Sequence, residues 1–358
     1  MREKRNYGID LLRIISMIMI PVLHILGHGG ILWNAEVLSV KYELVWLIEV
    51  AAYCAVDCYG LISGFVGYGS KYKYSNMLKL YFQVIFYTII VTGISKIVAL
   101  EKVGIGEWIK AIFPFAYETY WYYTAYFYMA FFIPFLNLIL DACDEKKARK
   151  LILTIFILYM LVPLISQVDA GKTLNGYSSL WLGLLYLIGA YIKKYNPFNE
   201  MKNLTKIGGY CLCVTIVWGT KLVIELASRQ KGEVVQNGNW LINFTSPMVV
   251  MSAIFLVLFF SNLEISNKMK KWIAFFAPLS FGVYLIHEEP VVRNLLIKDK
   301  FIGYLSLSPI ELVIAIIVTG IGIWFVCSLV DYVRIRIFSF LKIQQFSNWI
   351  VDKLLYHS

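Results

Sequence analysis

Apolar stretches of about 20 residues recur along the chain, separated by short segments that hold most of the charged residues. They are centred near residues 19, 56, 88, 130, 158, 186, 215, 252, 281 and 323. A lipid bilayer needs roughly 20 consecutive apolar residues for one helical span. The pattern predicts an all-α fold, a polytopic transmembrane helix bundle of about ten spans, with residues 1–358 as a single integral-membrane domain.

The composition agrees with this prediction and leaves little sequence for a soluble domain. Hydrophobic residues make up 59% of the 358 residues, and charged residues only 16%. Soluble domains have about half apolar residues and about a quarter charged ones. The six cysteines, of which Cys54 and Cys58 share a helix face, avoid the outer loops. We therefore expect them to pack as apolar residues and to form neither disulfides nor a metal site.

Lysine and arginine are distributed unevenly between the two sides of the predicted bundle. If the N-terminus, with Arg2 and Lys4, faces the cytoplasm, the inner segments hold roughly twice as many of these residues as the outer ones. This excess predicts an N-in and C-in topology with an even number of spans. The net charge of +10 therefore reflects topology and contact with anionic membrane lipids, and it does not indicate nucleic-acid binding.

The first apolar stretch carries polar residues that a lipid-facing helix would exclude. Its segment RIISMIMIPVLH begins with Arg13 and ends with His24. On an α-helix these two residues differ by only about 20° around the axis, and Asp10 and His28 lie within about 60° of Arg13. An ionised side chain at depth costs several kcal/mol against lipid, so we expect the stripe to face a polar cavity. The structural alternative is an Asp10–Arg13 ion pair near the cytoplasmic end, with a buried histidine bonded to a carbonyl group.

Several segments together resemble one known family. An Arg, ten residues and a His in the first span match its signature, and DCYGLISGFVGY at 57–68, WYYTAYFYMAFFIPFLN at 121–137, LYLIGAYIKKY at 185–195 and FGVYLIHEEP at 281–290 are similar to its other segments. The chain resembles membrane acyltransferase family 3, bacterial integral-membrane O-acetyltransferases that act on surface glycans and related acceptors. Many members carry an additional soluble domain outside the membrane. This chain ends at Ser358, so we expect that the membrane domain suffices or that a separate extracytoplasmic transferase completes the transfer.

The resemblance implies transfer of an acetyl group from cytosolic acetyl-CoA to a hydroxyl group of a glycan or lipid-linked acceptor at the outer face. Such a reaction needs a base for the hydroxyl proton and a stabiliser for the tetrahedral oxyanion. His24 suits the base, about 16 Å beyond Arg13 along the helix. Arg13 is then expected to hold a polar part of CoA or to orient carboxylates. Lys71, Lys73 and Lys79 are candidates to bind the CoA phosphates at the inner mouth, although contact with lipid headgroups is the commoner role of such lysines.

Carboxylates and a second histidine complete the predicted site. His287 is expected at a depth similar to that of the first-span histidine. With Glu288, Glu289 and Arg293, it is expected to line the access of the acceptor from outside. The alternative is a histidine at a helix end beside solvated carboxylates. Asp57 and Glu49 lie in the second stretch. Because a buried carboxylate requires a partner, we expect either one to orient the catalytic histidine or to pair with Arg13.

Aromatic residues on the outer side offer a place for a sugar. Trp121, Tyr122 and Glu118 are predicted to form a sugar-stacking mouth or, alternatively, part of an aromatic belt at the membrane interface. The segment 97–118 is predicted to hold a short interfacial helix on the outer surface.

Three further features have both a functional and a structural interpretation. His28 lies on the polar stripe and is a candidate for substrate binding. Ser63 is a second candidate, but with Gly64 it equally permits close helix packing, and no base adjoins it in the sequence for a nucleophilic role. Lys221 and Glu225 are four residues apart in one stretch and are expected to pair with each other.

The sequence leaves two main classes of function open. The first is an acetyl-CoA-dependent O-acyltransferase in a bacterial cytoplasmic membrane. The second is a transporter or flippase for a small anion or lipid-linked sugar, in which the polar stripe forms a substrate or proton path. Transporters more often show internal repeats with paired broken helices, and we find no second half that matches the Pro21 kink. A membrane sensor without activity is a third class, which the presence of both Arg13 and His24 disfavours.

Overall fold

The computed structural model describes residues 5–98, 102–232 and 238–355, which form helices and connecting segments without strands. Arg2 and Lys4, which belong to the expected cytoplasmic basic residues, lie outside the described residues. The predicted all-helical membrane fold is confirmed. The described α-helices are α1 Tyr7–Leu26, α2 Ile31–Asn34, α3 Val40–Tyr53, α4 Ala55–Gly67, α5 Tyr74–Ile97, α6 Ile105–Ile112, α7 Trp121–Ala130, α8 Ile133–Asp141, α9 Glu145–Phe156, α10 Val162–Ser166, α11 Ser179–Tyr195, α12 Asn203–Gln230, α13 Pro247–Ser261, α14 Asn267–Phe276, α15 Ser280–His287, α16 Pro290–Leu296, α17 Pro309–Phe340 and α18 Ile343–Leu355.

Helix length and composition set the number of membrane spans. Among the described residues, seven helical segments are long and apolar enough to cross a bilayer, or eight if α7 and α8, bent by 55°, form one broken span. The centre of every predicted apolar stretch falls within a helix, but α11 has only 17 residues and α13 only 15. A helix of 15 residues is about 22 Å long, which is less than the hydrocarbon core of roughly 30 Å. The structure therefore supports seven or eight spans where the sequence predicted about ten.

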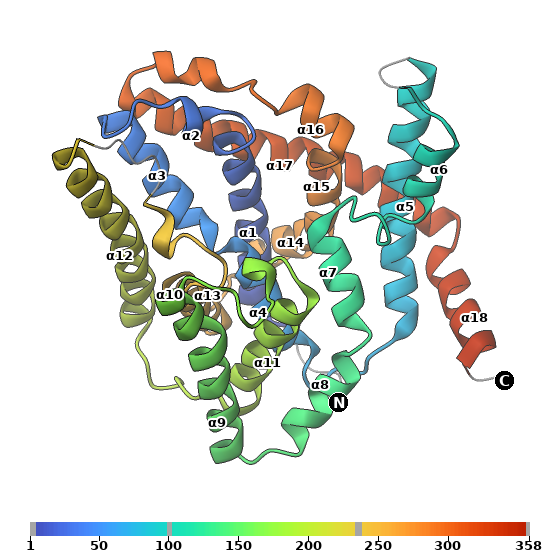
Figure 1. Ribbon diagram of the computed structural model, residues 1–358. Helices are drawn as coiled ribbons and strands as arrows, with labels where there is room; N and C mark the ends of the chain where they lie inside the picture. The colour runs from blue at the N-terminus through green and yellow to red at the C-terminus, as the bar shows by residue number, and fades with distance from the viewer. Residues whose placement is uncertain (1–4, 99–101, 233–237, 356–358) are drawn as a thin grey trace.

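Helix α1 lies inside the bundle and contacts α3, α4, α13, α15 and α17. Figure 1 shows α12 at one edge of the molecule and α5, α6 and α18 at the opposite edge. This central position gives the polar stripe of α1 protein neighbours in place of lipid.

Glycines allow α4 and α11 to touch backbone to backbone. A Cβ atom on Gly64 would lie 1.9 Å from the Tyr186 carbonyl oxygen, and one on Gly189 would lie 2.0 Å from the Leu61 carbonyl oxygen. Small residues at such contacts are typical of membrane helix pairs. The neighbouring Ser63 hydroxyl donates at 2.8 Å to the Tyr59 carbonyl oxygen of its own helix. Gly64 thus serves helix packing, whereas a role of Ser63 in substrate binding stays a prediction.

The segment 97–118 contains a helix, but this helix does not lie flat on an outer surface. Helix α6 packs beside α5, as Figure 1 shows, and residues 99–101 lie outside the described part of the chain. Thr88 and Tyr81 of α5 donate at 2.6 and 2.7 Å to the carbonyl oxygens of Ala111 and Ile112. The end of α6 is therefore level with the middle of α5. The expectation of an interfacial helix is corrected to a helix that returns along its neighbour.

The predicted pair in α12 forms within the protein interior. Lys221 Nζ lies 2.7 Å from a Glu225 carboxylate oxygen, and Tyr42 of α3 donates to the other oxygen at 2.6 Å. Both charged side chains are at most 1% exposed. This ion pair ties α12 to α3, which forms one wall of the cleft described next.

Candidate active site

The predicted catalytic histidine lies in the last turn of α1. Asn6 caps the start of this helix by accepting a hydrogen bond from the Ile9 N–H. The helix ends at Leu26, so His24 is helical whereas His28 lies beyond the end. The turn after α1 nevertheless keeps the two imidazole rings together, with 5.0 Å between their centroids.

A second segment brings its own polar residues against His24. Helix α15 ends at His287, and Glu288 follows directly. His24 Nδ1 lies 3.0 Å from His287 Nε2 and 3.1 Å from one Glu288 carboxylate oxygen. Arg293 of α16 donates to the other Glu288 oxygen at 2.5 Å, and His28 Nε2 lies 3.8 Å from that same oxygen. The structure thus brings together residues that the sequence offered only as separate candidates.

The hydrogen bonds determine which nitrogen of each ring carries a proton. His287 Nδ1 lies 2.6 Å from the Val283 carbonyl oxygen, which can only accept, so His287 Nδ1 is the donor. In the neutral ring, His287 Nε2 is then an acceptor and receives the His24 Nδ1–H. This assignment leaves His24 Nε2 unprotonated and without a hydrogen-bond partner among the described residues.

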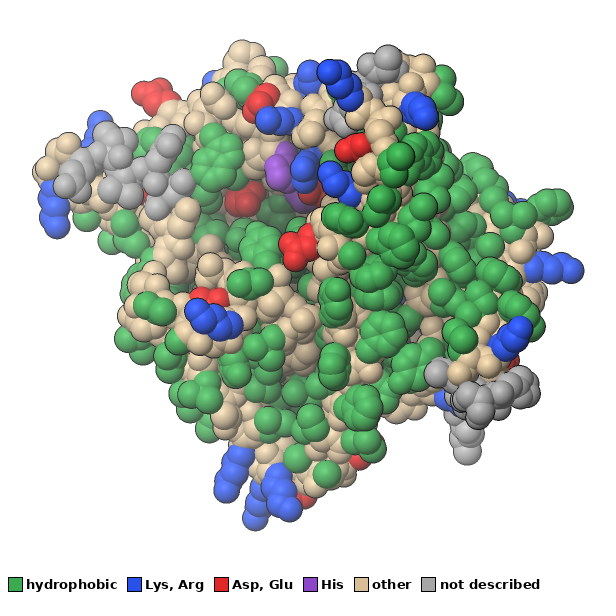
Figure 2. Space-filling view, turned by 45° about the vertical axis from the view of Figure 1, so that its right-hand side comes forward, with side chains coloured by type: hydrophobic (Ala, Val, Ile, Leu, Met, Phe, Trp, Pro, Cys, Tyr) green, Lys and Arg blue, Asp and Glu red, His purple; other side chains and the backbone are tan. Residues whose placement is uncertain are grey.

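A cleft of about 470 Å³ opens beside this cluster. A volume of this size is typical of small-molecule sites. Figure 2 shows the hollow in its upper centre, where a histidine side chain (purple) lies next to basic and acidic side chains above a hydrophobic floor. The lining includes His24, His28, Trp33, Trp46, Glu49, Tyr53, Trp121, Tyr177, Asn239, Ile242, Phe244, Glu288 and Arg293.

Glu49 of α3 lies in the wall of this cleft and is only 9% exposed. Among the described residues, its Oε2 atom has no hydrogen-bond partner, and no bond joins Glu49 to His24 or to Arg13. A buried carboxylate without a partner is costly unless a proton or a ligand satisfies it. Glu49 is therefore placed to contact whatever occupies the cleft.

Aromatic rings form one side of the cleft. The Trp121 ring lies 4.4 Å from Tyr177 and 6.0 Å from Phe244, and Tyr53 stacks on Phe244 at 4.7 Å, all between ring centroids. Of the three residues predicted to form a sugar-stacking mouth, Trp121 is therefore at the cleft. Glu118 is exposed, has a positive φ of 50° and does not belong to the lining.

Tyr122 belongs instead to a column of rings below the histidines. Successive ring centroids are 6.2 Å apart from Tyr59 to Tyr122, 6.3 Å from Tyr122 to Tyr284 and 6.4 Å from Tyr284 to His287. The Tyr59 hydroxyl donates at 2.8 Å to the carbonyl oxygen of Arg13. The column thus joins the two ends of the polar stripe of α1.

Arg13 forms an ion-pair cluster away from the histidines. Its Nη1 atom donates to Asp10 at 2.7 Å, and Arg5 donates to the other Asp10 oxygen at 2.5 Å. This is the pairing that we considered as the structural alternative for the stripe. With 28% of its side chain exposed, Arg13 remains accessible to a ligand.

Asp57 and the lysines after α4 lie outside the histidine cluster. Asp57 is fully buried and accepts a hydrogen bond from the Trp181 indole N–H at 3.1 Å, which ties α4 to α11. Its predicted contact with the catalytic histidine or with Arg13 is absent among the described residues. Lys71 and Lys73 are exposed in the connection between α4 and α5, and Lys79 is half-buried in α5.

Three side chains of the cluster also carry metal-ligating atoms. Those of His24, His28 and Glu288 lie within 4.8 Å of one another. Two ligands of one zinc ion can be no more than about 4.2 Å apart, given bonds of about 2.1 Å. Arg293 already neutralises Glu288. In this structure the cluster is connected by hydrogen bonds and by the Glu288–Arg293 ion pair.

The sequence did not identify several residues of the cleft. Tyr177, Asn239 and Phe244 come from two loops that are far apart in the chain, and nothing in their local pattern marks them. Arg293, by contrast, was expected beside the two glutamates of the HEEP segment, and it lines the cleft.

Comparison with known proteins identifies the domain. The profile of acyltransferase family 3, described as an acyltransferase domain, matches residues 6–329. The match includes every residue of the histidine cluster and of the cleft. No curated protein and no solved structure matches the chain significantly.

Proposed function

The chain belongs to acyltransferase family 3, and from this premise we propose that it moves an acetyl group from acetyl-CoA to a hydroxyl group of a surface glycan or lipid-linked acceptor. The observation that carries the proposal is the hydrogen bond from His24 to His287, which leaves His24 Nε2 free in the wall of a polar cleft. The cleft then opens at the outer face of a bacterial cytoplasmic membrane, with both termini inside, as the Lys and Arg distribution favours.

His24 acts as the general base. As the acceptor oxygen attacks the thioester carbonyl carbon, His24 Nε2 takes the hydroxyl proton. The tetrahedral intermediate then collapses, the C–S bond breaks, and the CoA sulfur leaves and takes the proton from the imidazolium. His287 positions the base by accepting the His24 Nδ1–H throughout.

Glu288 and Arg293 supply the charges that the reaction needs. When His24 becomes an imidazolium, the Glu288 carboxylate, 3.1 Å from Nδ1, stabilises its positive charge. Arg293 lines the same cleft, and its ion pair with Glu288 holds its guanidinium group beside the histidine cluster. We assign to Arg293 the stabilisation of the oxyanion, because a fixed cation in a site shielded from water favours developing negative charge.

The donor enters from the opposite end of α1. We infer that the CoA head group stays at the inner face near Arg13, with Lys71, Lys73 and Lys79 as candidates for its phosphates. The pantetheine arm then passes along the tyrosine column to bring the thioester to His24. The rings of Tyr59, Tyr122, Tyr284 and His287 follow one another between the two ends of this route, and the arm would pass beside them.

The acceptor lies in the cleft. The rings of Trp121 and Tyr177 offer flat apolar surfaces to a sugar ring. Glu49, with its unpartnered Oε2, accepts a hydrogen bond from an acceptor hydroxyl, and His28 is accessible at the rim with 44% of its side chain exposed.

The first experiment measures acetyl-CoA turnover. Protein in nanodiscs is mixed with acetyl-CoA and a mixed glycan acceptor, and free thiol release is followed for the wild type and His24→Ala. Because the substitution removes the base, we expect the rate to fall by about 10²- to 10⁴-fold. Acetyl-CoA affinity and the melting temperature should stay close to wild type.

Two results would contradict the proposal. One is a His24→Ala variant with the wild-type rate. The other is wild-type protein that binds no acetyl-CoA, which would favour a transporter or flippase for a small anion or lipid-linked sugar. Wild-type protein that binds acetyl-CoA without releasing thiol indicates a missing acceptor, and the assay is then repeated with envelope fractions.

A further inference from the structure

A second cavity lies directly behind the cleft. It measures about 100 Å³ and is lined by the same two loops that border the cleft, together with Met160, Pro163 and Leu164 of the preceding helical segment. Along the segment 239–246, Ile242 and Phe244 line the cleft, whereas Trp240 and Asn243 line the second cavity. Asn239 lines both. We call this second space the annex cavity and define it by Gln167, Asn175, Asn239, Trp240, Asn243 and Ser246.

The other loop divides its side chains in the same way. Gln167, Asp169 and Asn175 line the annex cavity, and Tyr177, two residues further on, lines the cleft. Asn243 Nδ2 donates to Asn175 Oδ1 at 3.2 Å and so fastens the two loops together. Because Asn239 lines both spaces, a ligand in the cleft that extended around Asn239 would come next to the annex cavity.

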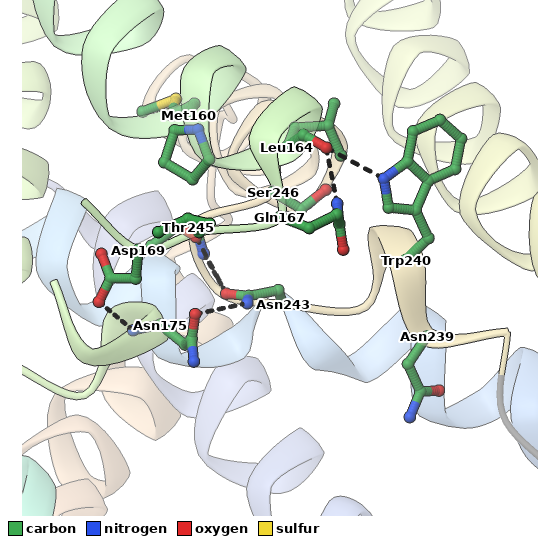
Figure 3. Close-up of a pocket in the computed structure, with 12 residues that line it drawn as sticks. Met160, Leu164, Gln167, Asp169, Asn175, Asn239, Trp240, Asn243, Thr245 and Ser246 are labelled. Atoms are coloured by element: carbon green, nitrogen blue, oxygen red, sulfur yellow. Dashed lines mark hydrogen bonds between the residues drawn. The ribbon is translucent and has the colours of Figure 1, made fainter. Parts of the chain in front are cut away.

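The lining of the annex cavity is polar but carries no positive charge. Figure 3 shows amide side chains on both loops, with the Trp240 indole at one side. None of the described residues in its lining is Lys or Arg. Burial raises the pKa of Asp169, but hydrogen bonds from Thr173 prevail and hold that pKa below its ordinary value. The carboxylate thus stays ionised and disfavours an anionic ligand.

One buried hydroxyl in this cavity lacks a partner. Ser246 is 3% exposed, and its Oγ atom makes no hydrogen bond among the described residues. Ser246 immediately precedes α13, where a serine usually caps the helix, yet its side chain accepts no capping bond. A buried unsatisfied hydroxyl costs about 1–3 kcal/mol. A ligand hydroxyl in the annex cavity would satisfy it.

We propose that the annex cavity holds an uncharged, hydroxyl-bearing edge of a second sugar unit, next to the unit that is acetylated. Amide groups and a serine hydroxyl match such groups, since each can both donate and accept hydrogen bonds. A volume of about 100 Å³ admits part of a sugar and not a whole ring. The protein therefore acts on chains of two or more units and disfavours free monosaccharides. This inference rests on the proposed function.

The test measures binding without any donor. Cello- and chito-oligosaccharides of one to four units are titrated onto the protein in nanodiscs, and affinities are read by saturation-transfer NMR. We expect at least a tenfold gain in affinity from one unit to two in at least one series. Trp240→Ala and Ser246→Ala should each reduce this gain at least threefold and leave the affinity for the single sugar unchanged.

Controls separate recognition from folding. Trp349→Ala removes an exposed tryptophan from α18, far from both cavities along the chain, and should keep the full gain. Ser246→Ala should also keep or raise the melting temperature, because it removes an unsatisfied hydroxyl. A purely structural serine would instead lower it.

The outcomes separate this inference from the proposed function. Equal affinity for one and several units, no binding in either series, or a gain that survives both substitutions overturns the annex site. Turnover of acetyl-CoA that depends on His24 leaves the proposed function standing in each of those cases. Length-dependent binding by a protein that neither binds nor turns over acetyl-CoA overturns the proposed function alone.

Discussion

The orientation of His24 depends on a residue 263 positions further along the chain. His287 accepts the His24 Nδ1–H because its own Nδ1–H is bound to the Val283 carbonyl oxygen. His24 Nε2 is therefore left without a proton because the ends of α1 and α15 meet and place His287 beside His24. A histidine in one helix alone would be free to present either nitrogen.

Substitution of His287 tests this arrangement. We expect His287→Ala to lower kcat by about 10- to 100-fold, less than loss of the base itself, and to leave the KM for acetyl-CoA unchanged. His287→Gln should recover part of kcat, because its amide oxygen can accept the same hydrogen bond. Steady-state kinetics of both variants check this. Equal losses in the two variants would contradict the role of His287 as the acceptor of the His24 Nδ1–H.

At the same scale, the sequence predicted single residues better than their contacts. Arg13, His24, His287 and Glu288 could be picked out because charged or polar residues are rare in apolar stretches. Asp57 was equally conspicuous, yet it bonds to Trp181. The spacing of residues in the sequence gives their depth along one helix. The partner of a buried carboxylate depends on the orientation of the neighbouring helices about their axes, which the spacing does not specify.

Helices α4 and α11 can pack closely because the glycines at their crossing have no side chains. We expect Gly64→Ala to destabilise the protein by about 1–3 kcal/mol or more, because the added methyl group would overlap the Tyr186 carbonyl oxygen. Thermal unfolding in detergent measures the effect. Gly219→Ala in α12 is the matched control, since a Cβ there meets no atom within 4 Å. Because alanine favours a helix more than glycine does, Gly219→Ala should not lose stability, and a similar loss in both variants would contradict the explanation by contact.

Element boundaries were predictable where apolar length alone decides them. Every predicted stretch is helical, but α13 is shorter than a span and α7 bends into α8. Helix α6 lies against α5 because the Tyr81 and Thr88 side chains bond to its last carbonyl groups. A hydropathy pattern contains no information on such side-chain bonds, so it favoured a surface location.

For the molecule as a whole, the N-in and C-in topology remains a prediction from charge. Lys71→Cys and Lys172→Cys place thiols in connections that this topology assigns to opposite sides. We expect a membrane-impermeant maleimide to label intact cells carrying Lys172→Cys and to label Lys71→Cys only after permeabilisation. Unsubstituted protein gives the background from the six native cysteines. The reverse pattern would put the cleft on the cytoplasmic side.

The chain of bonds from His24 through His287 to Val283 has a polarity. It ends on the Val283 carbonyl oxygen, which can only accept a hydrogen bond. Both N–H groups must therefore point away from the cleft and toward the backbone of α15. Inverting one ring would set two donors or two lone pairs against each other. For the proposed acyl transfer, this polarity predicts that His24 exchanges protons only on the cleft side, because the Val283 carbonyl oxygen cannot pass a proton on into the bundle.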